Sequence, residues 1–175
     1  NALVNHFDEE DLGFEEGKFP PEKTIYYSLL KNTGLHTENG FSDAPKNDEI
    51  KSLWNACTNF LKSTVEKQRK ISELIKILSA QPYKLKQGFI DFWIPTFLFI
   101  KRQDFALYDA NRGAYIPNVD MLFFDLLQKH PADYAVKAFE VDGVRLDFFN
   151  QYRRFVNLGD EFNITTQNFI ETIKP

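Results

Sequence analysis

Few side chains in this sequence have the type and spacing that catalysis or metal binding requires. Zinc sites use several cysteine or histidine ligands at short spacing, whereas His6, His36, His130 and Cys57 lie far apart along the chain. Cys57 also falls on an apolar helical stripe, which indicates a core thiol rather than an activated thiolate in a cleft. The histidines are better explained as exposed or hydrogen-bonded side chains. The sequence therefore predicts no metal site.

Acid–base and phosphate chemistry have equally weak signals. The paired acids Asp104 with Asp109, or Asp142 with Asp147, have the side chains for acid–base work, but solvated loop and cap carboxylates are far commoner. A phosphate-cradling loop needs clustered glycines at a strand–helix junction, and the eight glycines here are scattered. We therefore expect a non-catalytic chain with no bound cofactor.

Basic residues offer a better candidate, for nucleic-acid contact. Five of them flank a turn and a hairpin tip: Lys84, Lys86, Lys101, Arg102 and Arg112. If they converge on one face they can contact phosphates, with Arg112 entering a groove as a wing residue would. The alternative is a set of cations whose stems lie along an apolar core. Arg145, Arg153 and Arg154 form a second cluster, which neighbouring acids partly offset.

Composition limits the other function classes. The 175 residues include 18 phenylalanines and 15% aromatic side chains, and the net charge is −4. This charge argues against whole-surface attraction to nucleic acid or an anionic membrane, but not against a local basic patch. A single cysteine excludes an internal disulfide and suits a reducing cytoplasm. The excess of aromatics predicts apolar surface that other domains of a larger protein cover.

The element that must position these groups is an apolar segment over residues 89–100. Only Asp91, Pro95 and Thr96 interrupt it. A helix that is apolar on nearly every side must be buried on nearly every side. Residues 88–100 are too short to span a bilayer, so we expect the central helix of the core and no membrane partner.

The region before this helix is predicted to be helical. Asn1-Ala2 resembles the remnant of a removed expression tag and is excluded from the fold argument. Asp8 to Asp11 and Glu15-Glu16 predict an acidic, loop-like lead-in that is solvated and mobile. The pattern predicts a helix over 22–32 with Gly34 as left-handed C-cap, then an exposed loop over 36–46. Residues 47–81 predict one long helix or two helices broken near 66–70, ending at Gln81-Pro82.

The region after the central helix contains both helical spacing and the alternation that is typical of strands. Runs at 105–108 and 114–116 around an Asn- and Gly-containing reversal predict a hairpin. A helix over 119–129, capped by Asn118, and a strand over 134–141 follow. Residues 144–159 fit either a hairpin return or a helix, and the length favours a helix. A short last helix is expected over 166–173.

We therefore predict an α+β fold, predominantly helical, in which a helical bundle and a small β-hairpin form a winged-helix-like core. The expected divisions are 1–18 (tag remnant and lead-in), 19–80 (helical region) and 81–175 (winged-helix-like region). The latter two are expected to form one compact unit. The order is not a clean winged-helix match, since a strong helix follows the hairpin.

Five short motifs stand out between the end of the predicted helical region and the hairpin: Pro82-Tyr83, Leu85-Lys86, Gly88, Ala106-Leu107-Tyr108 and Tyr115-Ile116-Pro117. The stretch that contains them resembles a segment of very large bacterial ATPases, some of them encoded in anti-phage or restriction-type operons. Residues 19–36 also look like an upstream part of such proteins. That pattern has glycine at the position of Lys84, so a special turn geometry is not expected there.

The resemblance implies a non-catalytic module downstream of an ATPase domain, and no nucleotide-binding residue carries over. We expect the chain to be an excised domain of a larger bacterial protein. Its expected role is interdomain or protein–protein docking, with other domains of the parent protein as partners. The alternative is a winged-helix-like module that contacts nucleic acid.

Overall fold

The fold is α+β. In the computed structural model the described residues are 2–7, 9–15, 17–18, 20–38, 40–42 and 44–139. The expectations for 144–159 and 166–173, and for the cluster of Arg145, Arg153 and Arg154, lie outside these residues.

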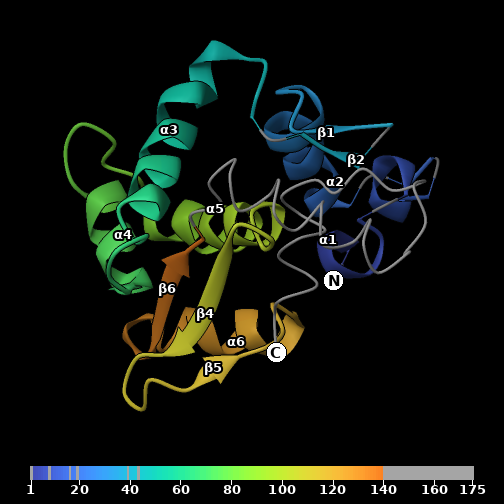
Figure 1. The fold of residues 1–175 in the computed structure, drawn as a ribbon. Helices are drawn as coiled ribbons and strands as arrows, with labels where there is room; N and C mark the ends of the chain where they lie inside the picture. Colours follow the sequence, from blue (N-terminus) through green and yellow to red (C-terminus); the bar gives the residue numbers. More distant parts are fainter. Residues whose placement is uncertain are drawn as a thin grey trace, which may run out of the picture.

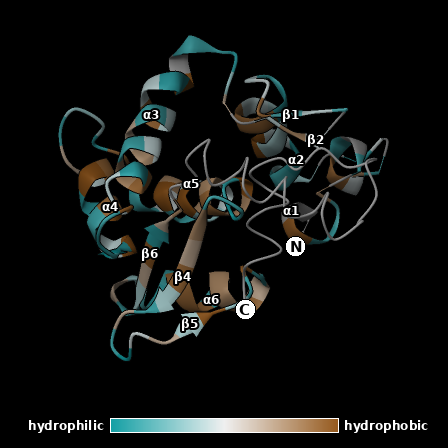
Figure 2. Cartoon of the chain, in the orientation of Figure 1, coloured by the Kyte–Doolittle hydropathy of each residue, from teal (hydrophilic) through white to brown (hydrophobic). Residues whose placement is uncertain are grey.

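Helix α5 (Gln87–Ile100) crosses the middle of the molecule, and the other elements are arranged around it (Figure 1). Seven of its side chains are buried, among them Trp93 and Phe97. Figure 2 shows this helix as apolar over almost its whole length. The predicted central helix is therefore confirmed.

Aromatic rings fix α5 against α3 (Asp48–Lys62). The Trp54 ring on α3 meets the rings of Trp93 and Phe97 edge to face, with centroids 6.2 and 5.1 Å apart. The indole Nε1 of Trp93 also donates to the Cys57 Sγ at 3.4 Å. Such pairs add about 0.5–1.5 kcal/mol each beyond the area they bury.

Pro95 lies inside α5 without ending it. A proline has no N–H, so the Asp91 carbonyl one turn earlier loses its helical partner. The Gln128 side chain of α6 (Met121–Lys129) donates to that carbonyl at 3.5 Å. A neighbouring helix thus partly replaces the bond that proline removes.

The long helical pattern before α5 divides into two helices, which is the broken form of the prediction. Helix α3 ends at Lys62, and α4 (Ile71–Ser79) follows an edge strand, β3 (Arg69–Lys70), that the sequence pattern did not indicate. At the start of α4 the Glu73 carboxylate accepts from the Lys70 amide at 3.2 Å and from the Arg69 Nε at 2.9 Å. This local capping explains why a new helix begins there.

A four-stranded antiparallel sheet packs below α5, in the order β3-β6-β4-β5 (Figure 1). Its strands after β3 are β4 (Phe105–Asp109), β5 (Tyr115–Ile116) and β6 (Tyr134–Ala138). The predicted hairpin and the predicted strand from residue 134 are confirmed. The buried Thr64 hydroxyl accepts from the Ala138 amide at 2.8 Å, which ties the end of β6 to the loop after α3.

The predicted cap of the helix after the hairpin was wrong. Asp120, not Asn118, is the N-cap of α6, because its carboxylate accepts from the Phe123 amide at 2.9 Å. The short helical turn η3 (Pro131–Asp133) joins α6 to β6.

The N-terminal elements lie together on one side of α5 (Figure 1). They are α1 (Ala2–Asn5), η1 (Glu10–Gly13), α2 (Pro21–Tyr26), the π-helical turn η2 (Tyr27–Lys31), β1 (His36–Thr37) and β2 (Gly40–Phe41). Gly34 has φ +74°, and the Leu35 amide donates to the Leu30 carbonyl at 3.0 Å, so the predicted C-cap is confirmed.

The exposed loop predicted over 36–46 was partly wrong. His36 and Pro45 are buried, and His36 and Thr37 pair with Phe41 and Gly40 as a small two-stranded ladder. The His36 ring packs against the rings of Tyr26 and Phe41, with centroids 5.6 and 4.6 Å away. These contacts join side chains of different elements, so the local polar composition did not reveal them.

Candidate docking groove

The five basic residues singled out in the sequence do not form one face. Lys84 and Lys86 are exposed before the N-terminus of α5, and Lys101 and Arg102 follow its C-terminus. The 14 residues of α5 separate the two pairs by about 20 Å at 1.5 Å per residue. Arg112 lies at the exposed tip of the β4–β5 hairpin.

Lys101 and Arg102 are engaged within the fold. The Lys101 Nζ lies 3.0 Å from the Asp104 carboxylate, and its side chain is only 13% exposed. The Arg102 guanidinium donates to the Phe99 carbonyl at 2.8 Å and lies over the rings of Phe7 and Phe99. Of the five, only Lys84 and Lys86 lie side by side and exposed.

Of the residues considered for catalysis, Cys57, Asp104 and Asp109 have burial or partners that give them structural roles, whereas Asp142 and Asp147 lie outside the described residues. Cys57 is fully buried, and burial raises the pKa of its thiol to about 12. Asp104 pairs with Lys101, whereas the Asp109 carboxylate at the other end of β4 accepts from the amides of Asn111 and Arg112. These amide hydrogen bonds hold the pKa of Asp109 below its usual value.

The histidines also lie apart. His6 pairs with Glu9, His36 is buried and His130 is exposed. Within the described ranges, no three histidine, cysteine or carboxylate side chains are grouped as a metal ion would require.

Sequence reasoning missed a polar cluster that holds the N-terminal segment against α2 and η2. The Asp11 carboxylate accepts from the Tyr27 hydroxyl at 2.8 Å, from the Tyr26 hydroxyl at 3.3 Å and from the Lys31 ammonium. The Tyr26 hydroxyl is also hydrogen-bonded to the His36 Nδ1 at 2.8 Å. No sequence motif marks this cluster, because its members span residues 11 to 36.

Two ionisation states follow from the cluster. The hydrogen bond from Lys31 is the main cause that holds the pKa of Asp11 below its usual value. Burial lowers the pKa of His36, so the neutral imidazole is favoured. The cluster therefore contains a carboxylate and an ammonium beside a neutral histidine.

The backbone that presents Asp11 is unusual. Asp11, Leu12 and Gly13 all have left-handed dihedral angles, with φ of 54°, 53° and 67°. For a residue with a side chain this region costs roughly 1–2 kcal/mol. The turn places the Asp11 carboxylate on the polar cluster and buries the Leu12 side chain.

An apolar groove runs between this N-terminal segment and helices α5 and α6. Its cavity volume is about 420 Å³, which is within the range of ligand and peptide-anchor sites. The lining residues are Val4, Leu12, Phe14, Glu22, Tyr26, Leu30, Gly88, Asp91, Phe92, Pro95, Thr96, Met121, Phe124, Asp125 and Gln128.

The charge of the groove has one sign. Its ionisable lining side chains are the carboxylates of Glu22, Asp91 and Asp125, together with the Tyr26 phenol, and the lining residues include no lysine, arginine or histidine. Asp91 accepts from the Gln87 amide at 2.6 Å, which leaves its negative charge in place. The groove therefore combines an apolar floor with negative charge.

Exposed leucines extend the apolar surface along α6. Leu122 is 66% exposed and Leu126 is 38% exposed. They are i,i+4 neighbours on the helix surface, and Leu122 is an i,i+3 neighbour of the groove residue Asp125. Apolar side chains are therefore left on the surface of the same helix that supplies Met121, Phe124 and Asp125 to the groove.

In the described part of the chain, no helix combines the length and apolarity that crossing a bilayer requires. Comparison with known protein families, curated proteins and solved structures found no match for this chain.

Proposed function

We propose that this chain is a non-catalytic docking module of a larger bacterial protein, one that also carries an ATPase domain. Its partner is an apolar segment of another domain that bears lysine or arginine side chains. The groove between the N-terminal segment, α5 and α6 supports this proposal most directly.

The apolar and acidic lining of the groove indicates which side chains the bound segment carries. Apolar and aromatic lining residues favour apolar anchor side chains, and carboxylates without a basic neighbour in the lining favour a cationic flank. An amphipathic helix that places its apolar side chains into such a groove is a common form of recognition. We therefore assign the groove to a basic amphipathic segment rather than to an acidic one.

A winged-helix-like core is the finer interpretation of the fold. The chain order α3, β3, α4, α5, β4 and then β6, with β6 between β3 and β4 in the sheet, supports it. In this interpretation β5 and α6 form an enlarged wing between β4 and β6. The predicted difficulty, a strong helix after the hairpin, is then an insertion within the wing.

The same interpretation favours a protein-docking function over recognition of a DNA groove. A helix-turn-helix protein places its recognition helix in the major groove, and α5 occupies that position in the chain order. Half of the residues of α5 are buried, including Trp93, Ile94 and four consecutive residues over 96–99. A helix used in this way as core cannot also enter a DNA groove.

Binding of a model peptide tests the proposal. The probe is a labelled 14-residue amphipathic peptide of leucine and lysine, and its control is the same peptide with glutamate in place of lysine. We expect micromolar binding of the lysine peptide at 150 mM salt and at least tenfold weaker binding of the glutamate peptide, measured by fluorescence anisotropy. Equal binding of both peptides would contradict the charge assignment.

Gly88 permits a variant that blocks the groove without harming the fold. A Cβ at Gly88 meets no atom within 4 Å, and the residue lies in the first turn of α5 and lines the groove. Because leucine favours a helix over glycine by roughly 0.5–1 kcal/mol, Gly88→Leu is expected to fold stably and weaken peptide binding at least tenfold. Gly88→Ala is the matched control, and it should retain binding within about threefold.

Carboxylate removal checks the electrostatic part. The double variant Asp91→Asn/Asp125→Asn should weaken the lysine peptide about tenfold. The control Glu38→Gln/Glu66→Gln removes the same charge from exposed positions outside the groove lining. If both variants weaken binding equally, the peptide responds only to net charge and the groove is not its site.

A further inference from the structure

A second hollow lies on the side of α5 that faces η2 and α3. Its volume is about 350 Å³. The lining residues are Ser28, Leu29, Thr33, Asn47, Ile50, Ser52, Leu53, Tyr83, Leu85 and Phe89. The docking groove contains none of these residues, so the two sites are separate.

Two aromatic rings in the hollow are partly exposed. The Phe89 ring stacks on the buried Trp93 ring, with a centroid distance of 6.0 Å and an interplanar angle of 21°. The Tyr83 hydroxyl donates to the Ser52 carbonyl at 3.4 Å. Both rings are therefore held by the fold while retaining exposed surface.

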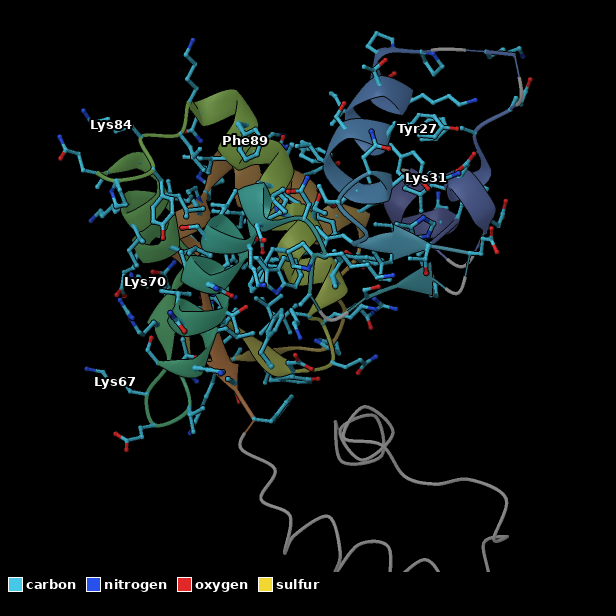
Figure 3. The ribbon with its side chains drawn as sticks, turned by 90° about the horizontal axis from the view of Figure 1, so that it is seen from above. Tyr27, Lys31, Lys67, Lys70, Lys84 and Phe89 are labelled. Atoms are coloured by element: carbon cyan, nitrogen blue, oxygen red, sulfur yellow. The ribbon has the colours of Figure 1, made fainter. Side chains whose placement is uncertain are left out.

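Lysines continue from this hollow along one side of the molecule. Lys84 and Lys86 alternate in sequence with the lining residues Tyr83 and Leu85. Figure 3 shows Lys84, Lys70 and Lys67 on the same side of the molecule, each extending outward, with Phe89 close to the Lys84 end.

The charge excess on this side is large for a chain with a net charge of −4. Residues 62–86 contain seven basic side chains and two acidic ones. One of the acids, Glu73, is already bound by Arg69 at 2.9 Å. In the described part of the structure, no hydrogen bond or ion pair engages the side-chain ammonium groups of Lys67, Lys84 and Lys86. The sequence shows the excess of basic residues over 62–86, but it does not show that these residues lie on one side of the molecule.

We infer that this side binds single-stranded nucleic acid. Lys67, Lys70, Lys84 and Lys86 contact phosphates at intervals along one strand, and an unstacked base enters the hollow against Tyr83 and Phe89. Aromatic faces beside a positively charged track are the features that bind single strands without sequence preference. A duplex does not offer its base faces, so the aromatic hollow favours a single strand.

The side-chain types on this side are compatible with a phosphate backbone. A lysine ammonium binds phosphate as a strongly hydrated point charge, without the bidentate geometry that arginine offers to carboxylates and phosphates alike. Arg69, the arginine within 62–86, is already held by Glu73, Ser63 and the Phe60 ring. The aromatic hollow beside the lysines, rather than the lysines themselves, therefore argues for a nucleic acid over an acidic peptide.

Binding of a fluorescein-labelled 12-nucleotide oligothymidylate tests the inference. We expect micromolar affinity at 50 mM salt, and a logarithmic salt slope of about −3 if four phosphates are neutralised at roughly 0.7 each. The corresponding 12-base-pair duplex should bind at least fivefold more weakly. No binding of the single strand at 50 mM salt, or stronger binding of the duplex, would overturn the inference.

Lys84 permits a charge-removing variant that does not strain the fold. Its φ is +48°, a conformation that glycine adopts without cost. Lys84→Gly should weaken oligothymidylate binding about three- to tenfold and reduce the salt slope by about 0.7. Lys129→Gln removes one exposed charge from the end of α6 and should leave the affinity within about twofold. Equal losses in the two variants would show a general charge effect and contradict the site.

The base-stacking part has its own test. Tyr83→Leu should weaken binding about tenfold, the usual scale of one base–aromatic contact, while leaving the salt slope unchanged. Vesicles containing phosphatidylserine are the remaining control. If they bind the protein, lose binding with Lys84→Gly and the oligonucleotide does not bind, this side recognises lipid phosphates and the nucleic-acid assignment is wrong.

Discussion

Two regions of this molecule are held together by different physics. Around α5, rings such as those of Trp54, Trp93 and Phe97 pack edge to face, and the sheet closes below them. The N-terminal segment instead depends on one carboxylate, Asp11, presented by a left-handed turn to two tyrosines and a lysine.

The difference bears on function, because the docking groove lies between the two regions. One wall of the groove is built on α5 and α6 and is stabilised by buried apolar side chains. The other wall includes Leu12 and Phe14, which lie next to the polar cluster. Dispersion and hydrophobic burial vary little with pH, whereas charged hydrogen bonds do. We therefore expect the N-terminal wall to be the more easily perturbed of the two.

The largest expected effect is on the α5 side. Phe97→Ala removes a ring that is 1% exposed and should reduce the free energy of unfolding by about 3–5 kcal/mol. Leu122→Ala, at a side chain that is 66% exposed, should change it by less than about 0.5 kcal/mol. Urea denaturation followed by circular dichroism measures both. Similar losses in the two variants would show that the region around α5 is not the dominant core.

A smaller and more local effect is expected from Asp11→Asn. The change removes the charge that Lys31 and the two tyrosine hydroxyls bind, at a cost of about 1–3 kcal/mol. Hydrogen exchange should then accelerate over residues 20–41 and remain slow in β4 and β6. Uniform acceleration across both regions would mean that they unfold as one unit and that the comparison is wrong.

Acidification should act on the same region in two steps. The pKa of His36 is lowered by burial, so the stability it supports is complete above its unfolded value of 6.5 and is lost as pH falls below it. The charge of Asp11 raises the pKa of His36 and the charge of Lys31 lowers it, but burial has the largest effect on this pKa. The pKa of Asp11 is also lowered, so its contribution is lost only below about pH 4, as pH falls through the folded-state value.

Hydrogen exchange of residues 20–41 between pH 7 and pH 5 measures the first step, after correction for the intrinsic pH dependence of exchange. His36→Gln should flatten this dependence, and Asp11→Asn should flatten the step below pH 4. An unchanged pH dependence in His36→Gln would show that the imidazole does not control the segment.

The smallest expected effect compares two left-handed residues. Lys84→Gly relieves backbone strain and loses no hydrogen bond seen in the described structure, so it should stabilise the protein by about 0.5 kcal/mol. Asp11→Gly relieves similar strain but loses the polar cluster, so it should destabilise the N-terminal segment. Thermal unfolding of both variants tests the contrast, and stabilisation by Asp11→Gly would show that the cluster contributes little.

Much of the fold could be predicted because its signals are local. The apolar run over 89–100, the reversal around Gly113 and the alternation from Tyr134 depend on near neighbours, and each became the expected helix, hairpin or strand. Two of the errors occurred where a partner on another element decides. The edge strand at Arg69 needs Val136 as its partner, and burial of His36 needs Tyr26 and Phe41.

The glycine-like turn at Lys84 is a related case. The lysine argued against special geometry there, yet its φ is +48°. The hydrogen bonds from the Lys84 amide to the Ala80 carbonyl, at 2.8 Å, and from the Leu85 amide to the Leu78 carbonyl, at 3.0 Å, constrain this turn. These backbone hydrogen bonds within the turn outweighed the intrinsic preference of the side chain.

The candidate sites were less predictable than the fold. Sequence identified Lys84 and Lys86, but it grouped them with Lys101 and Arg102, which α5 places at its opposite end. It did not identify Asp11, Glu22 or the groove, because no spacing rule relates η1 and α2 to residues on α5 and α6.

By itself, the sequence determined that a rod of apolar side chains over residues 89–100 must be buried and that α-helical and β elements alternate around it. Periodicity and turn preferences carry that information, and they act over a few residues. Only the tertiary structure decided which charges meet and where surface is left hollow. Those outcomes depend on how separate elements pack, since one helix can bring distant residues together or hold neighbouring clusters apart.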